Sequence, residues 1–337
     1  MTVLVALVSK DSLVMGCDSL GSETRFLLDP LNLANYFDQN NGMLKIGVDG
    51  KPLLKTIADL WAKTTATPIE HMTHMTKLYS LEPLSAGLMT TGIFSIGERT
   101  IKSLITEFKS KESQLINGGN LSEVANKIYE FINAFYLSFF KDPLYRPDLE
   151  FILGGYGKGE HTAKIFRINL RSQTIRQEFD NKNMAPYGVV FGGQFKEISR
   201  IVFGTDSENK IKIDQRHFEL LNSYREKIIS QFKIKGINDL ELPAVEMNKL
   251  LPEEQRMFAN NWDLNHFFAN WGDFSEQNAI ECVDFFVNIM IKSQQFSFGM
   301  PTIGGDTHIA LITEKSFDFI SKEEYHHGNY SVPKDGK

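Results

Sequence analysis

The feature that most constrains the fold is the start of the chain, where two short apolar runs are separated by a polar turn. The runs, rich in β-branched residues, are Val3–Leu7 and Leu13–Gly16, and the turn between them is residues 9–12. This pattern predicts a β-hairpin whose second strand ends at Cys17 and Asp18. The segment has no basic leading region and no small-residue cleavage site, so we interpret it as part of the fold and not as a signal peptide.

The remaining elements follow in an order that separates strands from helices. Residues 24–72 form a loop-rich stretch in which 53–63 has helical spacing, and we expect them to be an insertion. Strands are expected at 77–89, 151–156, 163–168, 175–179, 188–191 and 308–313, and helices at 101–108, 121–135, within 205–256 and at 274–295. The four strands between 151 and 191 are expected to form a second antiparallel sheet. This order favours an α+β fold in which antiparallel sheets pack between helices.

Composition narrows the classes of function. The chain has 337 residues, 42% hydrophobic and 23% charged, which is enough for a sizeable core. The net charge is -6 and there is no block of like charges, so we do not expect a nucleic-acid partner. No apolar run reaches the roughly 18 residues of a membrane span. Two cysteines are too few for a disulfide framework, so we expect a reducing, cytoplasmic location.

Thr2 is the most informative single residue for chemistry. Removal of the initiator methionine is sterically permitted before threonine, and it would leave a hydroxyl and a free α-amine on one residue. An α-amine ionises near pH 7.7–8.0, so it can act as the general base for its own Oγ. The alternative interpretation is that Thr2 is simply a residue at the start of a strand.

Asp18 and Lys77 are candidate partners of Thr2. The predicted hairpin returns Asp18 close to Thr2, where a carboxylate could orient a lysine or hold an ammonium group. A partly buried lysine at position 77 would lower the pKa of a nearby amine by like-charge repulsion. The alternatives are a turn aspartate and a solvated surface lysine. Cys17 and Ser19 flank Asp18 but are expected on the opposite face of the strand, so neither is the preferred nucleophile.

Five short motifs in this order resemble the proteasome β-subunit and HslV-like family of N-terminal-nucleophile hydrolases. They cover roughly 190 residues, and no single motif is specific by itself. They are Thr2–Val5 through Val14–Ser19, with the same sixteen-residue step from threonine to aspartate; Lys77 with Pro83, Gly87 and the turn Thr90-Thr91-Gly92; Gly154-Gly155-Tyr156; the stretch 186–193; and Thr302–Gly305 with Ile309–Thr313.

The resemblance implies a four-layer αββα sandwich in one domain, residues 1–320, with insertions at about 24–72 and 204–272 and a tail at 321–337. In it, Thr2 is the nucleophile and the amine base, Asp18 holds the lysine, and Lys77 tunes the amine. Backbone N–H groups of Thr91 and Gly92 form the oxyanion hole. Ser19 and Ser22 line the substrate cleft, although simple turn polarity explains these two serines equally well.

The implied activity is that of a proteasome-like threonine endopeptidase that acts through an acyl-enzyme. It needs no cofactor and no metal. A peptide or amide is the expected substrate, a homo-oligomeric ring is the expected assembly, and an ATPase is a possible partner. A small-molecule amidase is a further alternative.

Three departures from the family pattern leave an inactive assembly or binding subunit as an alternative. Thr91 stands where the family has glycine, although a backbone donor survives that change. Gly192 takes the place of a serine that supports the catalytic amine. The aspartate and serine usual near Met300–Ile303 are absent, although Thr302 and Asp306 lie close by.

Other candidate features have simpler interpretations. His71 and His74 have a spacing that could share one helix face, but no third metal ligand accompanies them. An aromatic cluster, formed by Trp262, Phe267, Phe268 and Trp271, is interpreted as core more readily than as a binding surface. The glycine-rich run 154–159 lacks the context of a phosphate loop and is expected to be a strand and turn.

Overall fold

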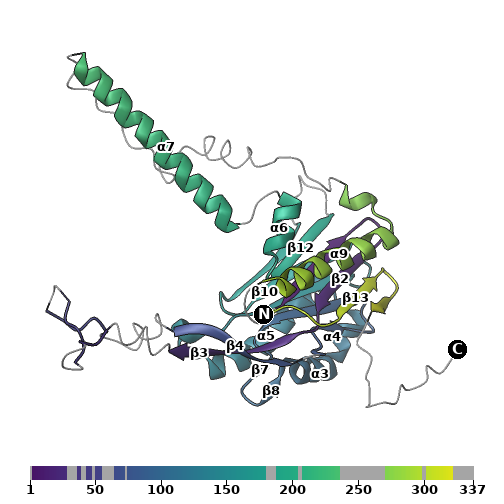
Figure 1. The fold of residues 1–337 in the computed structure, drawn as a ribbon. Helices are drawn as coiled ribbons and strands as arrows, with labels where there is room; N and C mark the ends of the chain where they lie inside the picture. The colour runs from purple at the N-terminus through teal and green to yellow at the C-terminus, as the bar shows by residue number, and fades with distance from the viewer. Residues whose placement is uncertain are drawn as a thin grey trace.

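The computed structural model describes residues 2–28, 36–38, 43–47, 50–54, 64–72, 74–179, 187–203, 207–235, 270–297 and 301–321. Two five-stranded antiparallel sheets form its centre (Figure 1). The first has the order β12 (Gly188–Gly193), β1 (Val3–Val8), β2 (Leu13–Asp18), β13 (Thr307–Ile312) and β14 (Phe317–Ser321). The second has the order β11 (Thr174–Glu178), β10 (Lys164–Asn169), β9 (Leu149–Gly155), β6 (Ala86–Gly92) and β5 (Leu78–Ser80).

The sheets pack against each other and each has helices on its other face. Side chains of both sheets, such as Leu4, Met15 and Ile152, form one buried cluster. A second cluster joins the first sheet to α6 (Lys196–Phe203) and α9 (Glu276–Gln295). A third joins the second sheet to α3 (Ile101–Lys111), α4 (Ser113–Gly118) and α5 (Leu121–Phe139). Because the first sheet is covered on both faces, every side chain of β1 and β2 is buried.

Local sequence explains these elements. The predicted hairpin is confirmed, since Leu4 pairs with Cys17 across β1 and β2. The predicted start of α5 is also confirmed, because the Asn120 side chain accepts a hydrogen bond from the backbone N–H of Glu123. In α9, apolar residues at helical spacing, including Cys282 and Phe286, face the first sheet. The fold is therefore a mixed α+β arrangement with antiparallel sheets, as the sequence predicts.

Three expectations about the elements are wrong. The strand at 188–191 is real, but it pairs with β1 in the first sheet and not with the strands from 151 to 179. Residues 90–92 are the end of strand β6 and not a turn. The stretch 24–72 contains most of two paired strands, β3 (Gly21–Leu28) and β4 (Thr64–Met72). The threonines of β4 are β-branched, and such residues favour strands. Residues 55–63 of the helix expected at 53–63 lie outside the described residues.

Smaller elements complete the structure. Strands β7 (Ser95–Ile96) and β8 (Arg99–Thr100) precede α3, and short 3-10 helices occur at η1 (Pro143–Tyr145) and η3 (Trp271–Asp273). The helix expected within 205–256 is α7 (Ser207–Ile234), which extends away from the sheets (Figure 1); residues 236–256 lie outside the described part. Among the described helices, none has the length and apolar character needed to cross a membrane.

Candidate functional site

Thr2 lies at the entry to β1, and its side chain is almost completely buried, with 4% of the residue exposed. Its carbonyl accepts a hydrogen bond from the backbone N–H of Gln194, 2.8 Å away. The residue before Gln194 is Gly193, with φ of +67°, and a Cβ there would collide with the Thr2 carbonyl oxygen. Glycine is required at this position because the backbone of Thr2 passes too close for any side chain.

Asp18 lies at the end of β2, directly beside the start of β1, and is fully buried. One carboxylate oxygen, Oδ1, accepts from the backbone N–H of Val3 at 3.1 Å. The other, Oδ2, accepts from the N–H groups of Gly304 at 3.1 Å and Leu20 at 3.3 Å. The hairpin register places the carboxylate here, and the three backbone donors stabilise its charged form.

Lys77 precedes β5 and reaches from the second sheet to the first. Its Nζ donates to Asp18 Oδ1 at 3.0 Å and to the carbonyl oxygen of Leu20 at 2.6 Å. Its side chain is 8% exposed and that of Asp18 is 0% exposed. A buried pair of opposite charges with its remaining hydrogen bonds satisfied is electrically neutral and rigid.

A pocket of about 270 Å³ joins these groups to the end of β6. Thr2, Lys77, Thr91 and Gly92 all line it. Thr2 is contributed by the first sheet, and the other three come from the second sheet or the turn that leads to it. The structure therefore brings the nucleophile, lysine and oxyanion-hole residues predicted from the sequence to one cavity, with Asp18 behind Lys77.

The two serines predicted for the substrate cleft have different positions. Ser22 lines the pocket. Ser19 does not: it is fully buried, and its Oγ accepts a hydrogen bond from the backbone N–H of Asp306 at 2.7 Å. Ser19 therefore fixes the loop that precedes β13, a role that its position one residue beyond a strand end could not indicate.

The pocket contains groups that the sequence did not point to. They include Met75, Thr76, Tyr79, Thr90, Ile93, Phe94, Thr100, Ile101 and Lys102. Thr90 is 7% exposed, and its Oγ1 has no hydrogen-bond partner among the described residues. His74, Lys77 and Lys102 are basic, and none of the lining residues found in the described part is Asp or Glu. The hydrophobic residues among them lie before or within β5, just after β6 and at the start of α3, and sequence alone does not distinguish them from core residues.

Two of the three departures from the family pattern, Gly192 and the region around Thr302, lie next to polar side chains. A Cβ at Gly192 would lie 3.0 Å from Glu150 Oε1 and 3.2 Å from Leu4 Cδ1, so Gly192 leaves room for the Glu150 carboxylate. Thr302 is buried, and its Oγ1 donates to Gln194 Oε1 at 3.0 Å. Gln194 also holds the Thr2 carbonyl, so Thr302 supports the site through that residue.

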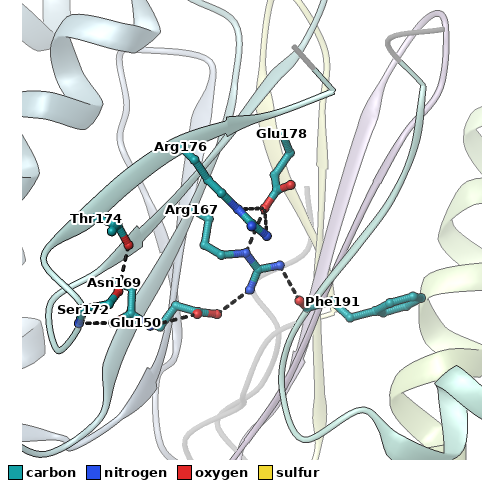
Figure 2. Close-up of polar contacts among 8 residues, drawn as sticks. All are labelled: Glu150, Arg167, Asn169, Ser172, Thr174, Arg176, Glu178 and Phe191. Carbon is teal, nitrogen blue, oxygen red and sulfur yellow. Dashed lines mark hydrogen bonds and ion pairs between the residues drawn. The ribbon is translucent and has the colours of Figure 1, made fainter. Parts of the chain in front are cut away.

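A network of charged side chains between the two sheets was not predicted from the sequence (Figure 2). The Arg167 guanidinium, on β10, donates to Glu150 Oε1 at 2.7 Å, to Glu178 Oε1 at 2.8 Å and to the carbonyl oxygen of Phe191 at 2.6 Å. Phe191 lies on β12, so Arg167 links the second sheet to the first. Charged residues that alternate with apolar ones in a strand normally indicate a solvent face, which is why the pattern gave no signal.

The remaining candidate residues have structural roles or lie outside the described part. Burial raises the pKa of the Cys17 thiol, so this residue stays protonated and is a poor nucleophile. His71 lies on strand β4 and not on a helix, and the expectation of a shared helix face is wrong. No group of His, Cys, Asp and Glu that could hold a metal ion occurs in the described ranges. Of the aromatic cluster, Trp271 is described; Trp262, Phe267 and Phe268 lie outside.

Comparison with known proteins finds similarity only at the level of three-dimensional structure. No family model matches the chain, and no curated protein matches it. It is similar to an Anbu (Gly-1) mutant from Hyphomicrobium sp. strain MC1, with 12% identity and a TM-score of 0.47, covering 96% of this chain and 86% of that one. It is also similar to Anbu, an ancestral β-subunit, from Yersinia bercovieri, with 12% identity and a TM-score of 0.43, covering 96% and 88%.

These findings correct the family assignment made from the sequence. The chain is not assigned to the proteasome β-subunit and HslV-like family, because no family model and no curated protein supports that assignment. The two structures named above are Anbu structures, and at 12% identity with TM-scores below 0.5 they establish neither family nor activity.

Proposed function

We propose that this chain is a threonine-type amide hydrolase, an endopeptidase whose nucleophile is Thr2 after removal of Met1. The observation that supports it most is the meeting of Thr2 with the buried Asp18–Lys77 pair at one pocket. A hydroxyl at a chain start, a rigid ammonium group and a cavity for substrate are what single-residue nucleophilic catalysis requires.

The reaction follows from these positions. The Thr2 α-amine takes the proton of its own Oγ, and Oγ adds to the carbonyl carbon of the amide. The oxyanion that develops is stabilised by backbone N–H groups of Thr91 and Gly92. The α-ammonium then gives its proton to the departing amine, which leaves an ester on Oγ. A water, deprotonated by the same α-amine, adds to the ester, and Oγ–H is regenerated as the acid is released.

Lys77 and Asp18 have distinct roles in this scheme. The Lys77 ammonium group lies on the pocket and disfavours a second positive charge on the nearby α-amine, which keeps that amine available as a base. Asp18 holds Lys77 in place through a 3.0 Å ion pair and is itself fixed by three backbone donors. The apolar and hydroxyl-bearing residues of the pocket would bind the acyl side of the substrate.

We also propose that the two sheets and their flanking helices form a four-layer αββα sandwich within a single domain. It is supported by the three buried clusters, one between the sheets and one on the outer face of each. A homo-oligomeric ring and an ATPase partner stay predictions, and native mass spectrometry of the purified chain would test the first of them.

Intact-mass analysis before and after treatment with a threonine-directed epoxyketone tests the proposed function. We expect loss of Met1 and a single covalent adduct. Thr2→Ala should abolish the adduct and lower peptidase activity by roughly 10³-fold or more, because it still allows Met1 removal but lacks the nucleophile. Thr106→Ala is the matched control: it removes the hydroxyl of an exposed threonine on α3, outside the pocket, and should keep the adduct. A retained Met1 with no adduct would instead favour an inactive binding subunit.

A further inference from the structure

The pocket beside Thr2 has three basic residues in its lining and, in the described part of the chain, no acidic one. Two of the three have a carboxylate partner. Lys77 Nζ lies 3.0 Å from Asp18 Oδ1, and His74 Nδ1 lies 3.6 Å from Asp306 Oδ2. The third basic residue is therefore the one whose charge needs an explanation.

This third residue is Lys102, an exposed residue of α3 that lines the pocket together with Thr2. Among the described residues, no carboxylate lies within ion-pair distance of its ammonium group. The acidic side chain of α3, Glu107, contacts Arg99 and Lys111 instead. In the free protein the Lys102 charge at the pocket is therefore balanced by solvent and dissolved ions.

Lys102 also occupies a position in the helix that disfavours a cation. The helix begins at Ile101 with Thr100 as its N-cap, so Lys102 is its second residue, and the first turn has no acidic residue. A helix start carries a partial positive charge and favours anions, whereas cations are favoured near the helix end. An anion in the pocket would compensate both the lysine and the start of α3.

Hydroxyl groups in the same lining supply hydrogen-bond donors for such an anion. Thr100 Oγ1 accepts from the backbone N–H of Ser103 at 3.1 Å, which leaves its own O–H proton available to donate. Thr90 Oγ1 is buried and has no partner in the described part of the chain. Both threonines line the pocket. An ionised carboxylate is an acceptor only, so a lining with unused donors and without acidic residues suits it.

We propose that this pocket selects substrates with an acidic side chain, Glu or Asp, in the residue whose carbonyl Thr2 attacks, and that Lys102 determines this specificity. The proposal rests on the proposed function, which places the attacked carbonyl beside Thr2. The side chain of the same substrate residue then enters the pocket that Thr2 and Lys102 both line. Because Lys102 is exposed, the gain is that of a partly solvated ion pair, and we expect roughly 5- to 10-fold selectivity.

The test measures kcat/KM of the full-length protein for three fluorogenic peptide amides that differ only in the residue before the cleaved bond. This residue is glutamate, its neutral analogue glutamine, or lysine. We expect the glutamate substrate to exceed the glutamine substrate by roughly 5- to 10-fold, and the lysine substrate to be the poorest. The ratio should fall toward one as the salt concentration rises from about 0.05 M to about 0.5 M, because salt screens an exposed ion pair.

Variants at position 102 assign the selectivity to the lysine. Lys102→Met should remove the preference for glutamate, and Lys102→Glu should favour the lysine substrate. Lysine, methionine and glutamate are all good helix formers, so both variants should keep the fold. Lys127→Met is the matched control: it removes an exposed lysine of α5, outside the pocket, with the same change in net charge. This control should keep the preference.

Binding to Thr2→Ala separates selection from hydrolysis. Isothermal titration calorimetry with the glutamate and glutamine peptides should show tighter binding of the glutamate peptide, and Lys102→Met in the same background should remove the difference. Equal kcat/KM for the two substrates, or a preference that survives in Lys102→Met, overturns the inference and leaves the proposed function intact. Preferential binding of the glutamate peptide without hydrolysis or adduct overturns the proposed function and keeps the acid-selective pocket. Neither preference nor hydrolysis overturns both.

Discussion

Replacing Asp18 by asparagine should destabilise the protein more than any other isosteric change at the site. Each carboxylate oxygen accepts two hydrogen bonds: Oδ1 from the Val3 N–H and Lys77 Nζ, and Oδ2 from the N–H groups of Leu20 and Gly304. An amide has one acceptor oxygen, so two of these four donors lose their partner whichever way it is oriented. The buried Lys77 ammonium also loses its counter-charge.

The size of the effect follows from burial. Breaking a buried ion pair by removing one charge costs about 3–5 kcal/mol in the free energy of unfolding, and both side chains here are nearly or fully buried. At about 2 °C per kcal/mol for a chain of this size, the melting temperature should fall by about 6–10 °C. Differential scanning calorimetry measures this directly.

Two further variants separate the effect of the unpaired Lys77 charge from that of the lost hydrogen bonds. In Lys77→Met the carboxylate keeps its three backbone donors, so the loss of stability should be smaller, about 1–3 kcal/mol. The double variant lacks the uncompensated cation and should be no less stable than Asp18→Asn alone. Lys10→Met removes an exposed pair with Asp273 and should leave the melting temperature unchanged. A shift below about 2 °C in Asp18→Asn, or additive losses in the double variant, would refute this account of the site.

Two other predictions concern alkaline stability and the pocket. Burial raises the pKa of Cys282 and of Tyr156 to about 12, so in the folded state both keep protons that the unfolded chain releases at lower pH. The urea midpoint should therefore fall as pH rises from about 8 to about 10, less so in Cys282→Ala, and a flat midpoint would contradict it. Thr90→Val removes a buried hydroxyl that has no partner within the described part of the chain, so stability should be kept or raised by up to about 1 kcal/mol. The KM for a substrate that accepts a hydrogen bond from this hydroxyl should rise roughly 10-fold. An unchanged KM would exclude Thr90 from substrate contact.

The part of the site that the sequence predicts best is the part that is local in the chain. Two strands joined by a four-residue turn must pair, and their pairing brings Asp18 beside the start of β1. The helices at 101–108 and 274–295 were also predictable, because each has an apolar stripe of helical period and a capping residue. Lys77 lies 59 residues from Asp18, and nothing in its local pattern distinguishes it from a surface lysine, so its contact with Asp18 could not be predicted from local sequence.

The features that could not be predicted are those that depend on how strands far apart in the sequence pair and how the two sheets pack against each other. The strand at 188–191 has no local property that selects β1 over β10 as its partner, so its assignment to the second sheet was wrong. Glu150 and Arg167 alternate with apolar residues, which is also the pattern of strands with one face in water. That face is buried only because the other sheet packs against it. Since Gly192 of that sheet has no side chain, it leaves room for the Glu150 carboxylate.

The same dependence explains why the two sheets must be held in register at this end of the molecule. Thr2 and Asp18 come from the first sheet, while Thr91 and Glu150 come from the second. Lys77 and Arg167 each cross between the sheets, one through Asp18 and the other through the Phe191 carbonyl. A change at Asp18 therefore alters stability and geometry together.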